Sequence, residues 1–91
     1  MHLSHARPNP SADAFWFDFD VPSQAGTVRL SVYDSAGRLV RRIVDSPIER
    51  GRHTCDWDGR DAAGSAVASG VYFVRLEVGE NSAVRKTVLL R

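Results

Sequence analysis

A strict alternation of apolar and polar residues is the feature that most limits what this chain can fold into. The stretch FWFDFDV at residues 15–21 places Phe15, Phe17, Phe19 and Val21 on one side of an extended chain. A period of two with one apolar side is typical of a half-buried antiparallel strand. Five further stretches are also predicted to be strands, at residues 27–34, 39–44, 52–57, 70–78 and 83–91.

Turn residues separate these stretches at short intervals. Asp34-Ser35-Ala36-Gly37 and Asp61-Ala62-Ala63-Gly64 share the spacing Asp-x-Ala-Gly. Asp favours the first position of a type I turn, and Gly supplies the left-handed residue that follows it. We therefore expect a positive φ at both Gly37 and Gly64.

No stretch keeps a helical period of 3.6 residues over three turns. Short strands at regular spacing predict an all-β chain, and one polar side per strand favours an antiparallel β-sandwich of about seven strands. The residues that alternate inward form the predicted core: Phe17, Phe19, Val28, Leu30, Val32, Trp57, Tyr72, Val74 and Leu76.

The length of 91 residues suits one domain with one core. Residues 1–12 contain Pro8 and Pro10 and show no periodicity, so we interpret them as an extended lead-in and place the domain at residues 13–91. Cys55 is the only cysteine, which excludes an internal disulfide and a cysteine-based zinc site.

Charge and hydropathy exclude two broad classes of partner. Twelve basic and eleven acidic side chains give a net charge of +1, which argues against a nucleic-acid-binding module. No apolar run approaches the ~20 residues of a membrane span, so we expect no stable membrane insertion.

Asp56, Asp58 and Asp61 lie close enough in sequence to suggest a calcium loop. The helix–loop–helix template fails, because position five is Arg60 and position six, which should be Gly, is Asp61. Two turns in which each Asp bonds nearby backbone amides fit the sequence better. We therefore predict no metal site.

His53 and Cys55 project from one side of a predicted strand, as a thiolate–imidazole pair would. Trp57 continues that side, which favours a buried structural thiol. The chain also lacks a Gly-x-Ser-x-Gly nucleophile motif and a glycine-rich phosphate loop. We therefore expect neither catalysis nor a cofactor.

Two surface features leave alternatives open. Trp16 is predicted to lie on the outer side of its strand. It is either an exposed ring that stacks on a sugar or a ring covered by the lead-in or by a parent domain. The basic last stretch, RKTVLLR, is either a solvated strand or an edge strand at which another protein pairs.

Five motifs, taken in order, resemble one known family. They are Pro-Asn-Pro at 8–10, VYDSAGRLV at 32–40, WDGRDAAG at 57–64, ASGVYFVRLEVG at 68–79 and RKTVLL at 85–90. The chain resembles the C-terminal Ig-like modules related to the Ig-like domain of the flagellar hook-capping protein. It is also similar to the type A C-terminal sorting domains of the type IX secretion system. The resemblance implies an Ig-like, fibronectin-III-like sandwich.

Within the sorting family, the resemblance implies a non-catalytic C-terminal signal for the secretion and surface attachment of a bacterial protein. The implied location is the cell surface or outer membrane, as part of a larger protein. The implied partners are the secretion translocon or the parent catalytic domain. The residues implied to bind the partner are Pro8, Asn9, Pro10, Gly70, Tyr72, Lys86 and Arg91.

Two other functions stay open. WDGRDAAG is more typical of the hook-cap branch, which would make the chain a structural assembly module that pairs with other subunits. A carbohydrate-binding accessory domain would need two or more coplanar exposed aromatic rings, and Trp16 is the only candidate. We expect the isolated domain to be monomeric.

Overall fold

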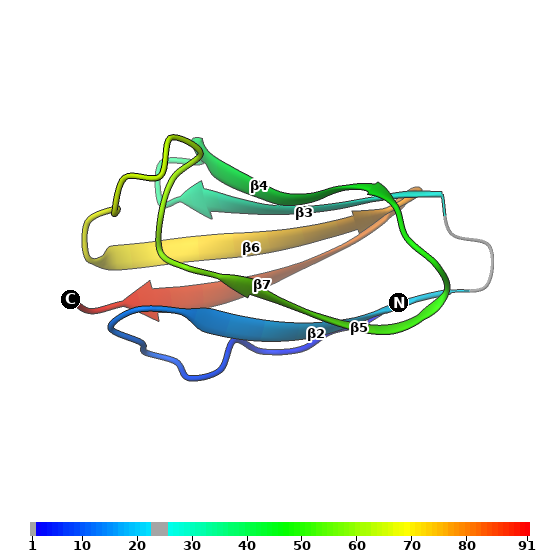
Figure 1. Cartoon of the computed structure of the whole chain (residues 1–91), viewed down its shortest axis with the longest axis horizontal. Helices are drawn as coiled ribbons and strands as arrows, with labels where there is room; N and C mark the ends of the chain where they lie inside the picture. Colours follow the sequence, from blue (N-terminus) through cyan, green and yellow to red (C-terminus); the bar gives the residue numbers. More distant parts are fainter. Residues whose placement is uncertain (1, 23–25) are drawn as a thin grey trace.

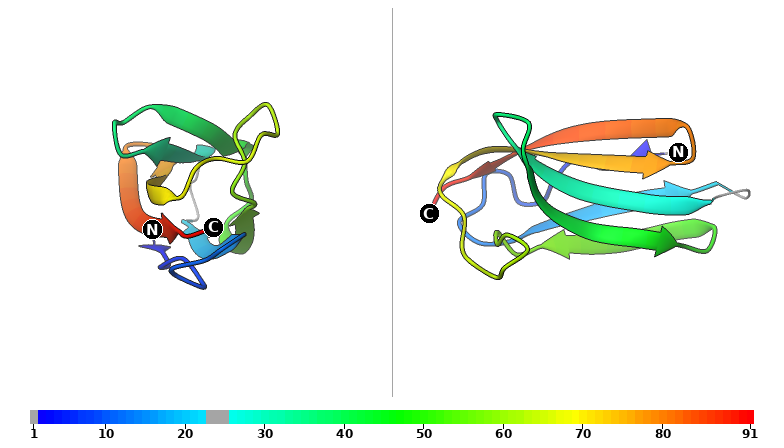
Figure 2. Two further views of the ribbon diagram at one scale, coloured as in Figure 1. Left: turned by 90° about the vertical axis from the view of Figure 1, so that its left-hand side faces the viewer. Right: turned by 90° about the horizontal axis from the view of Figure 1, so that it is seen from above.

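The computed structural model describes residues 2–22 and 26–91, which form two facing antiparallel β-sheets (Figures 1 and 2). One sheet has the strand order β1-β2-β5 and the other has the order β4-β3-β6-β7. The strands are β1 (His2–Leu3), β2 (Phe15–Val21), β3 (Thr27–Asp34), β4 (Leu39–Pro47), β5 (Gly51–Trp57), β6 (Gly70–Val78) and β7 (Asn81–Leu89). The predicted all-β, Ig-like sandwich is confirmed. Over the described residues, no helix could cross a membrane.

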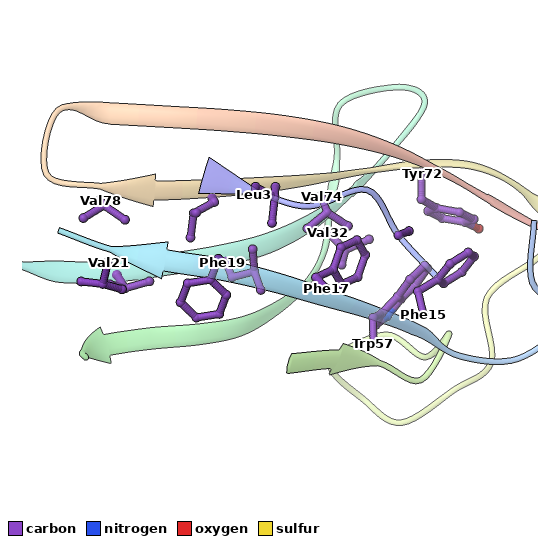
Figure 3. Close-up of a cluster of buried hydrophobic side chains, with 14 of the residues drawn as sticks. Leu3, Phe15, Phe17, Phe19, Val21, Val32, Trp57, Tyr72, Val74 and Val78 are labelled. Atoms are coloured by element: carbon purple, nitrogen blue, oxygen red, sulfur yellow. The ribbon is translucent and has the colours of Figure 1, made fainter. Parts of the chain in front are cut away.

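The core lies between the two sheets, and all nine residues predicted for it are buried. The ring of Trp57 stacks on Phe15 with centroids 5.9 Å apart, and Tyr72 meets Trp57 edge-on at 5.2 Å (Figure 3). The indole N–H of Trp57 donates to the carbonyl oxygen of Arg60 at 2.9 Å, so the buried ring keeps its hydrogen bond. Trp57 belongs to the WDGRDAAG motif and Tyr72 to the ASGVYFVRLEVG motif, so this aromatic cluster lies at the end of the sandwich where the two motifs meet.

The two Asp-x-Ala-Gly turns have the same internal bonding. In each, the Asp Oδ1 accepts the N–H groups two and four residues later, at 2.9 Å for Asp34 and 3.0 Å for Asp61. The N–H of Arg38 is the main reason that the pKa of Asp34 lies below its ordinary value. The φ angles are +82° at Gly37 and +87° at Gly64, so the predicted positive values are confirmed.

The N-terminal segment differs from the lead-in that we expected outside the domain. His2 and Leu3 form β1, which pairs with β2, and Leu3 is fully buried in the core (Figure 3). Ala6 and Ser11 are also buried. A two-residue strand is too short to show a period of two, so the alternation that marks the longer strands could not reveal it.

Candidate functional site

Asn9, the centre of the Pro-Asn-Pro motif, binds the last strand through its side chain. Its Nδ2 donates to the carbonyl oxygen of Lys86 at 3.1 Å, and its Oδ1 accepts the N–H of Val88 at 2.9 Å. The amide therefore imitates the two backbone groups that a neighbouring strand would offer. In Figure 1 the blue lead-in and the red β7 lie side by side.

Ser11 continues this pairing along β7. Its N–H donates to the carbonyl oxygen of Val88 at 3.0 Å, and its own carbonyl oxygen accepts the N–H of Leu90 at 2.9 Å. Together, Asn9 and Ser11 occupy the outward backbone groups of β7 between Lys86 and Leu90. The hypothesis that this part of the last strand is an open pairing edge is therefore wrong.

Arg91 binds the turn that follows β5. Its Nη2 donates to the carbonyl oxygen of Gly59 at 2.6 Å, and its Nε donates to that of Val67 at 2.9 Å. Its backbone N–H also donates to Oγ of Ser69 at 2.8 Å. The guanidinium thus ties the end of the chain to the WDGRDAAG loop. A charge reversal at Arg91 would remove the two side-chain bonds, so it would disturb the fold as well as any partner.

Gly70 and Tyr72 stand at the start of β6, next to the same loop. Tyr72 is buried, and its hydroxyl donates to the carbonyl oxygen of Ala68 at 2.6 Å. Burial is the main reason that the pKa of Tyr72 lies above its ordinary value. The ring and its hydroxyl therefore hold the loop in place and are not accessible to a partner.

The seven residues implied by the resemblance thus come together around one end of β7. Three of them, Asn9, Tyr72 and Arg91, form hydrogen bonds that hold the fold together. Pro8 and Pro10 are exposed, and so is Lys86, which forms no ion pair within the described part of the chain. Of the implied charged residues, only Lys86 leaves its charge unused by the fold.

Lys86 lies within an apolar surface that the sequence analysis did not identify. Register places Lys86 opposite Phe73, Phe73 opposite Tyr33, and Val71 opposite Val88, all on the outside of the four-stranded sheet. Val84 shares this face, opposite Arg75. We call this surface the outer patch: Tyr33, Val71, Phe73, Val84, Lys86 and Val88.

The outer patch is exposed and hollowed. Val71 is 38% exposed and Val84 is 47% exposed, and the two flank the pair formed by Phe73 and Lys86. A hollow of about 350 Å³ is lined by Tyr33, Asp34, Ser35, Gly37, Phe73, Arg75 and Val84. Contiguous exposed apolar side chains with a charged residue among them are typical of a protein-docking surface.

One signal in the sequence could have revealed the outer patch. In GVYFVRLEV the residues between the core positions should be polar on a solvated sheet, but two of them are Val71 and Phe73. Lys86 then follows in the neighbouring strand. The inward residues alone were used to predict the core, so the outward apolar pair was overlooked.

The exposed ring of Trp16 lies on the opposite sheet. It is 46% exposed, as expected, and its neighbour Asp18 binds Arg7 and Thr54. The hydrogen bond from Thr54 is the main cause of the lowered pKa of Asp18, followed by that from Arg7. The other outward aromatic residues, Tyr33 and Phe73, belong to the four-stranded sheet. Trp16 and these two rings therefore do not form one sugar platform.

The acidic cluster after β5 is used for turns and one ion pair. Oδ1 of Asp58 accepts the backbone N–H of Arg60 at 3.1 Å and binds Nη1 of Arg41 at 2.9 Å. Asp61 is occupied by its own turn. The interpretation as Asp-initiated turns is confirmed. Among the described residues, no three His, Cys, Asp or Glu side chains are grouped as metal ligands. The absence of a metal stays a prediction.

His53 and Cys55 are held by separate contacts. The His53 ring stacks on Phe19 at 5.5 Å, and its Nε2 lies 2.6 Å from the carbonyl oxygen of Glu49. Cys55 was predicted to be buried, but it is only half-buried against the core, because β5 is an edge strand. Burial raises the pKa of the Cys55 thiol to about 12, with Asp56 and Asp18 adding smaller effects.

We expect Cys55 to react slowly with thiol reagents. At pH 8 its thiolate fraction, and hence its labelling rate, should be at least about a hundredfold below that of a free thiol, and the rate should rise with pH. Labelling followed by mass spectrometry measures this, with the urea-unfolded chain as the fast control. Equal rates in the folded and unfolded states would contradict the prediction.

Comparison with known proteins places this fold in a family. The family model described as the FlgD Ig-like domain matches residues 9–82, which is most of the chain. The chain belongs to the FlgD Ig-like domain family. The matched range contains Asn9 and Pro10 of the lead-in and both Asp-x-Ala-Gly turns. It ends before Lys86 and Arg91, so the family match does not bear on those two residues.

Curated relatives include the basal-body rod modification protein FlgD of Salmonella typhimurium. It is 30% identical to the chain over 60 residues, which is 66% of this chain and 26% of that protein. The chain therefore spans about a quarter of the length of this FlgD relative.

Three solved structures have a similar fold. The first is dimeric latent PorU from Porphyromonas gingivalis, with a TM-score of 0.73 at 21% identity, over 93% of this chain and 9% of that one. PorZ, a surface component of the type IX secretion system of the same organism, has a TM-score of 0.66 at 27% identity, over 96% and 11%. FlgD from P. aeruginosa has a TM-score of 0.59 at 25% identity, over 85% and 60%.

Proposed function

We propose that this FlgD-type Ig-like domain is a non-catalytic sorting and surface-attachment signal of a secreted bacterial protein. It docks on a component of the type IX translocon. The observation that carries the proposal is the outer patch: Lys86, unpaired within the described chain, stands among exposed Val71 and Val84 and half-buried Phe73 and Val88.

The similarity to PorZ supports this assignment. PorZ is described as an essential bacterial surface component of the type IX secretion system, and 96% of this chain aligns with a small part of it at 27% identity. A domain of this kind therefore occurs within a larger secretion-system protein. The relation favours a domain that acts by protein contacts at the cell surface over a catalytic one.

The partner should combine apolar and acidic side chains. Lys86 contributes an unused positive charge, while the nearby acid Asp34 is occupied by its turn and by Arg38. Glu77 lies 3.8 Å from Arg75 and is balanced by it. An acidic side chain on the translocon component would pair with Lys86 and set the orientation of the docked domain.

Export of a fused reporter tests the proposal. A reporter carrying the chain at its C-terminus is produced in a bacterium with a type IX system. We expect Lys86→Glu to lower the exported fraction about tenfold, the effect of losing roughly 1.4 kcal/mol of docking energy. The change is at a solvated site, so the free energy of unfolding should shift by less than about 0.5 kcal/mol.

The matched control is Arg50→Glu, the same charge reversal at an exposed residue in the loop between β4 and β5. It should leave export unchanged. Normal export of the Lys86→Glu variant would reject docking through the outer patch. Failure of the unmodified chain to direct export would reject the sorting function itself.

A structural role of the hook-cap type is the second candidate. The family match over residues 9–82 and the 30% identity to FlgD favour it. In that case the chain would bind flagellar rod or hook subunits and would not direct the export of a reporter. Binding of the purified chain to those subunits, measured alongside reporter export, separates the two functions.

A further inference from the structure

The two sheets end in four edge strands, and three of these carry features that oppose pairing with another chain. The edge of β7 is covered over residues 86–90 by Asn9 and Ser11, and β1 is only two residues long. β4 has irregular register with β3 at two places, ends in Pro47 and has the carbonyl oxygen of Val40 bonded to Ala62. Short strands, bulges, proline and covering loops are the usual protections of an edge.

The fourth edge, that of β5, has none of these features. β5 runs over residues 51–57 in unbroken register with β2, and no strand lies on its other side. It forms the margin of its sheet, with β2 between it and β1. The strand contains no proline.

Bonds on the far side of β2 reveal which backbone groups of β5 point outward. Trp16 exchanges both of its backbone hydrogen bonds with Arg7, and the carbonyl oxygen of Asp18 accepts the N–H of Ser4. The even-numbered residues of β2 therefore turn their backbone groups toward the N-terminal segment. Because these groups alternate along a strand, the odd-numbered residues of β2 turn theirs toward β5.

It follows that alternate residues of β5 keep their backbone groups free. Trp57, Cys55 and His53 stand opposite odd-numbered residues of β2 and bond with them, so the groups of Arg52, Thr54 and Asp56 point away from the sheet. Within residues 2–22 and 26–91, no turn, loop or cross-sheet backbone bond uses those three residues. All three side chains are exposed.

In place of the monomer expected from the sequence, we infer that β5 pairs antiparallel with β5 of a second copy of this chain, about a two-fold axis at Thr54. This register places Arg52 opposite Asp56 of the second copy and Asp56 opposite Arg52 of the second copy. It also pairs all three residues that have free backbone groups. Both copies use the same surface, so the contact closes as a dimer.

Charge is the reason for choosing a second copy as the partner. Arg52 and Asp56 form no ion pair within the described residues, so both charges are available. Opposite charges facing each other across a strand pair are favourable, and like charges are not. A two-residue shift of the register would leave one of the three free residues unpaired. This inference is independent of the proposed sorting function, which uses the other sheet.

Sedimentation equilibrium of the 91-residue chain, from about 10 µM to about 1 mM, tests the dimer in the range of weak association. We expect the apparent mass to rise toward twice the monomer mass. Arg52→Asp alone puts two acids opposite each other, and Asp56→Arg alone puts two arginines opposite each other. Each variant should raise the dissociation constant at least about tenfold. Circular dichroism confirms that each variant is folded.

Mixing the two variants gives the decisive measurement. A copy with Arg52→Asp carries acids at both positions, and a copy with Asp56→Arg carries arginines at both, so the mixture should form a heterodimer although each variant alone is monomeric. The double variant Arg52→Asp, Asp56→Arg should dimerise again. An unmodified chain that stays monomeric at about 1 mM would overturn the proposal, and so would a mixture that fails to associate.

Discussion

Replacement of Leu3 by Ala is expected to lower the free energy of unfolding by about 2–5 kcal/mol, the usual cost of removing a buried Leu side chain. Leu3 is fully buried and belongs to the same core cluster as Phe17, Phe19 and Val74. Its removal would leave a cavity beneath β1, which the short strand cannot easily close. Urea unfolding followed by tryptophan fluorescence measures the change.

His5→Ala is the control for this prediction, because His5 lies in the same segment and is exposed. It should change the free energy of unfolding by less than about 0.5 kcal/mol. If Leu3→Ala behaved like His5→Ala, the N-terminal segment would not be part of the cooperative unit. Residues 1–12 would then behave as the extended lead-in outside the domain that the sequence suggested.

The strands that could be predicted from the sequence are those long enough to show a repeating pattern of inward and outward residues. FWFDFDV and GVYFVRLEV alternate over seven and nine residues, so β2 and β6 were predicted with their bounds. The Asp-x-Ala-Gly turns were predicted because Gly37 and Gly64 meet a local backbone requirement. β1 was missed because Leu3 is buried by long-range packing, and a strand of two residues leaves no pattern in the sequence that predicts such packing.

The candidate site was predicted less well, because a motif does not say what its residues contact. Asn9 and Arg91 were interpreted as partner-binding, yet both bind main-chain groups of this chain. Pairing of residues 77 or more positions apart, as for Asn9 with Lys86, depends on the fold and leaves no local pattern. The outer patch depends on register in the same way, since Phe73 and Lys86 meet only across paired strands.

Gly59→Ala is expected to be among the most destabilising single substitutions in the chain, at about 2–5 kcal/mol. Gly59 has φ +73°, which is unfavourable for any residue with a Cβ atom. A Cβ at this position would also lie 2.6 Å from Nη2 of Arg91 and 2.8 Å from the carbonyl oxygen of Asp13. The Arg91 side chain could move, but the backbone of Asp13 could not do so without shifting the segment that precedes β2.

Gly64→Ala separates backbone strain from this collision. Gly64 has a similar φ of +87°, but a Cβ there would meet nothing within 4 Å, so its substitution should cost only about 1 kcal/mol. Thermal and urea unfolding of both variants measure the difference, and equal losses would show that the contacts at Gly59 are not close. Arg91→Ala should lower the free energy of unfolding by less in the Gly59→Ala variant than in the unmodified chain. In that variant the new Cβ has already displaced the guanidinium, so it has fewer bonds left to lose.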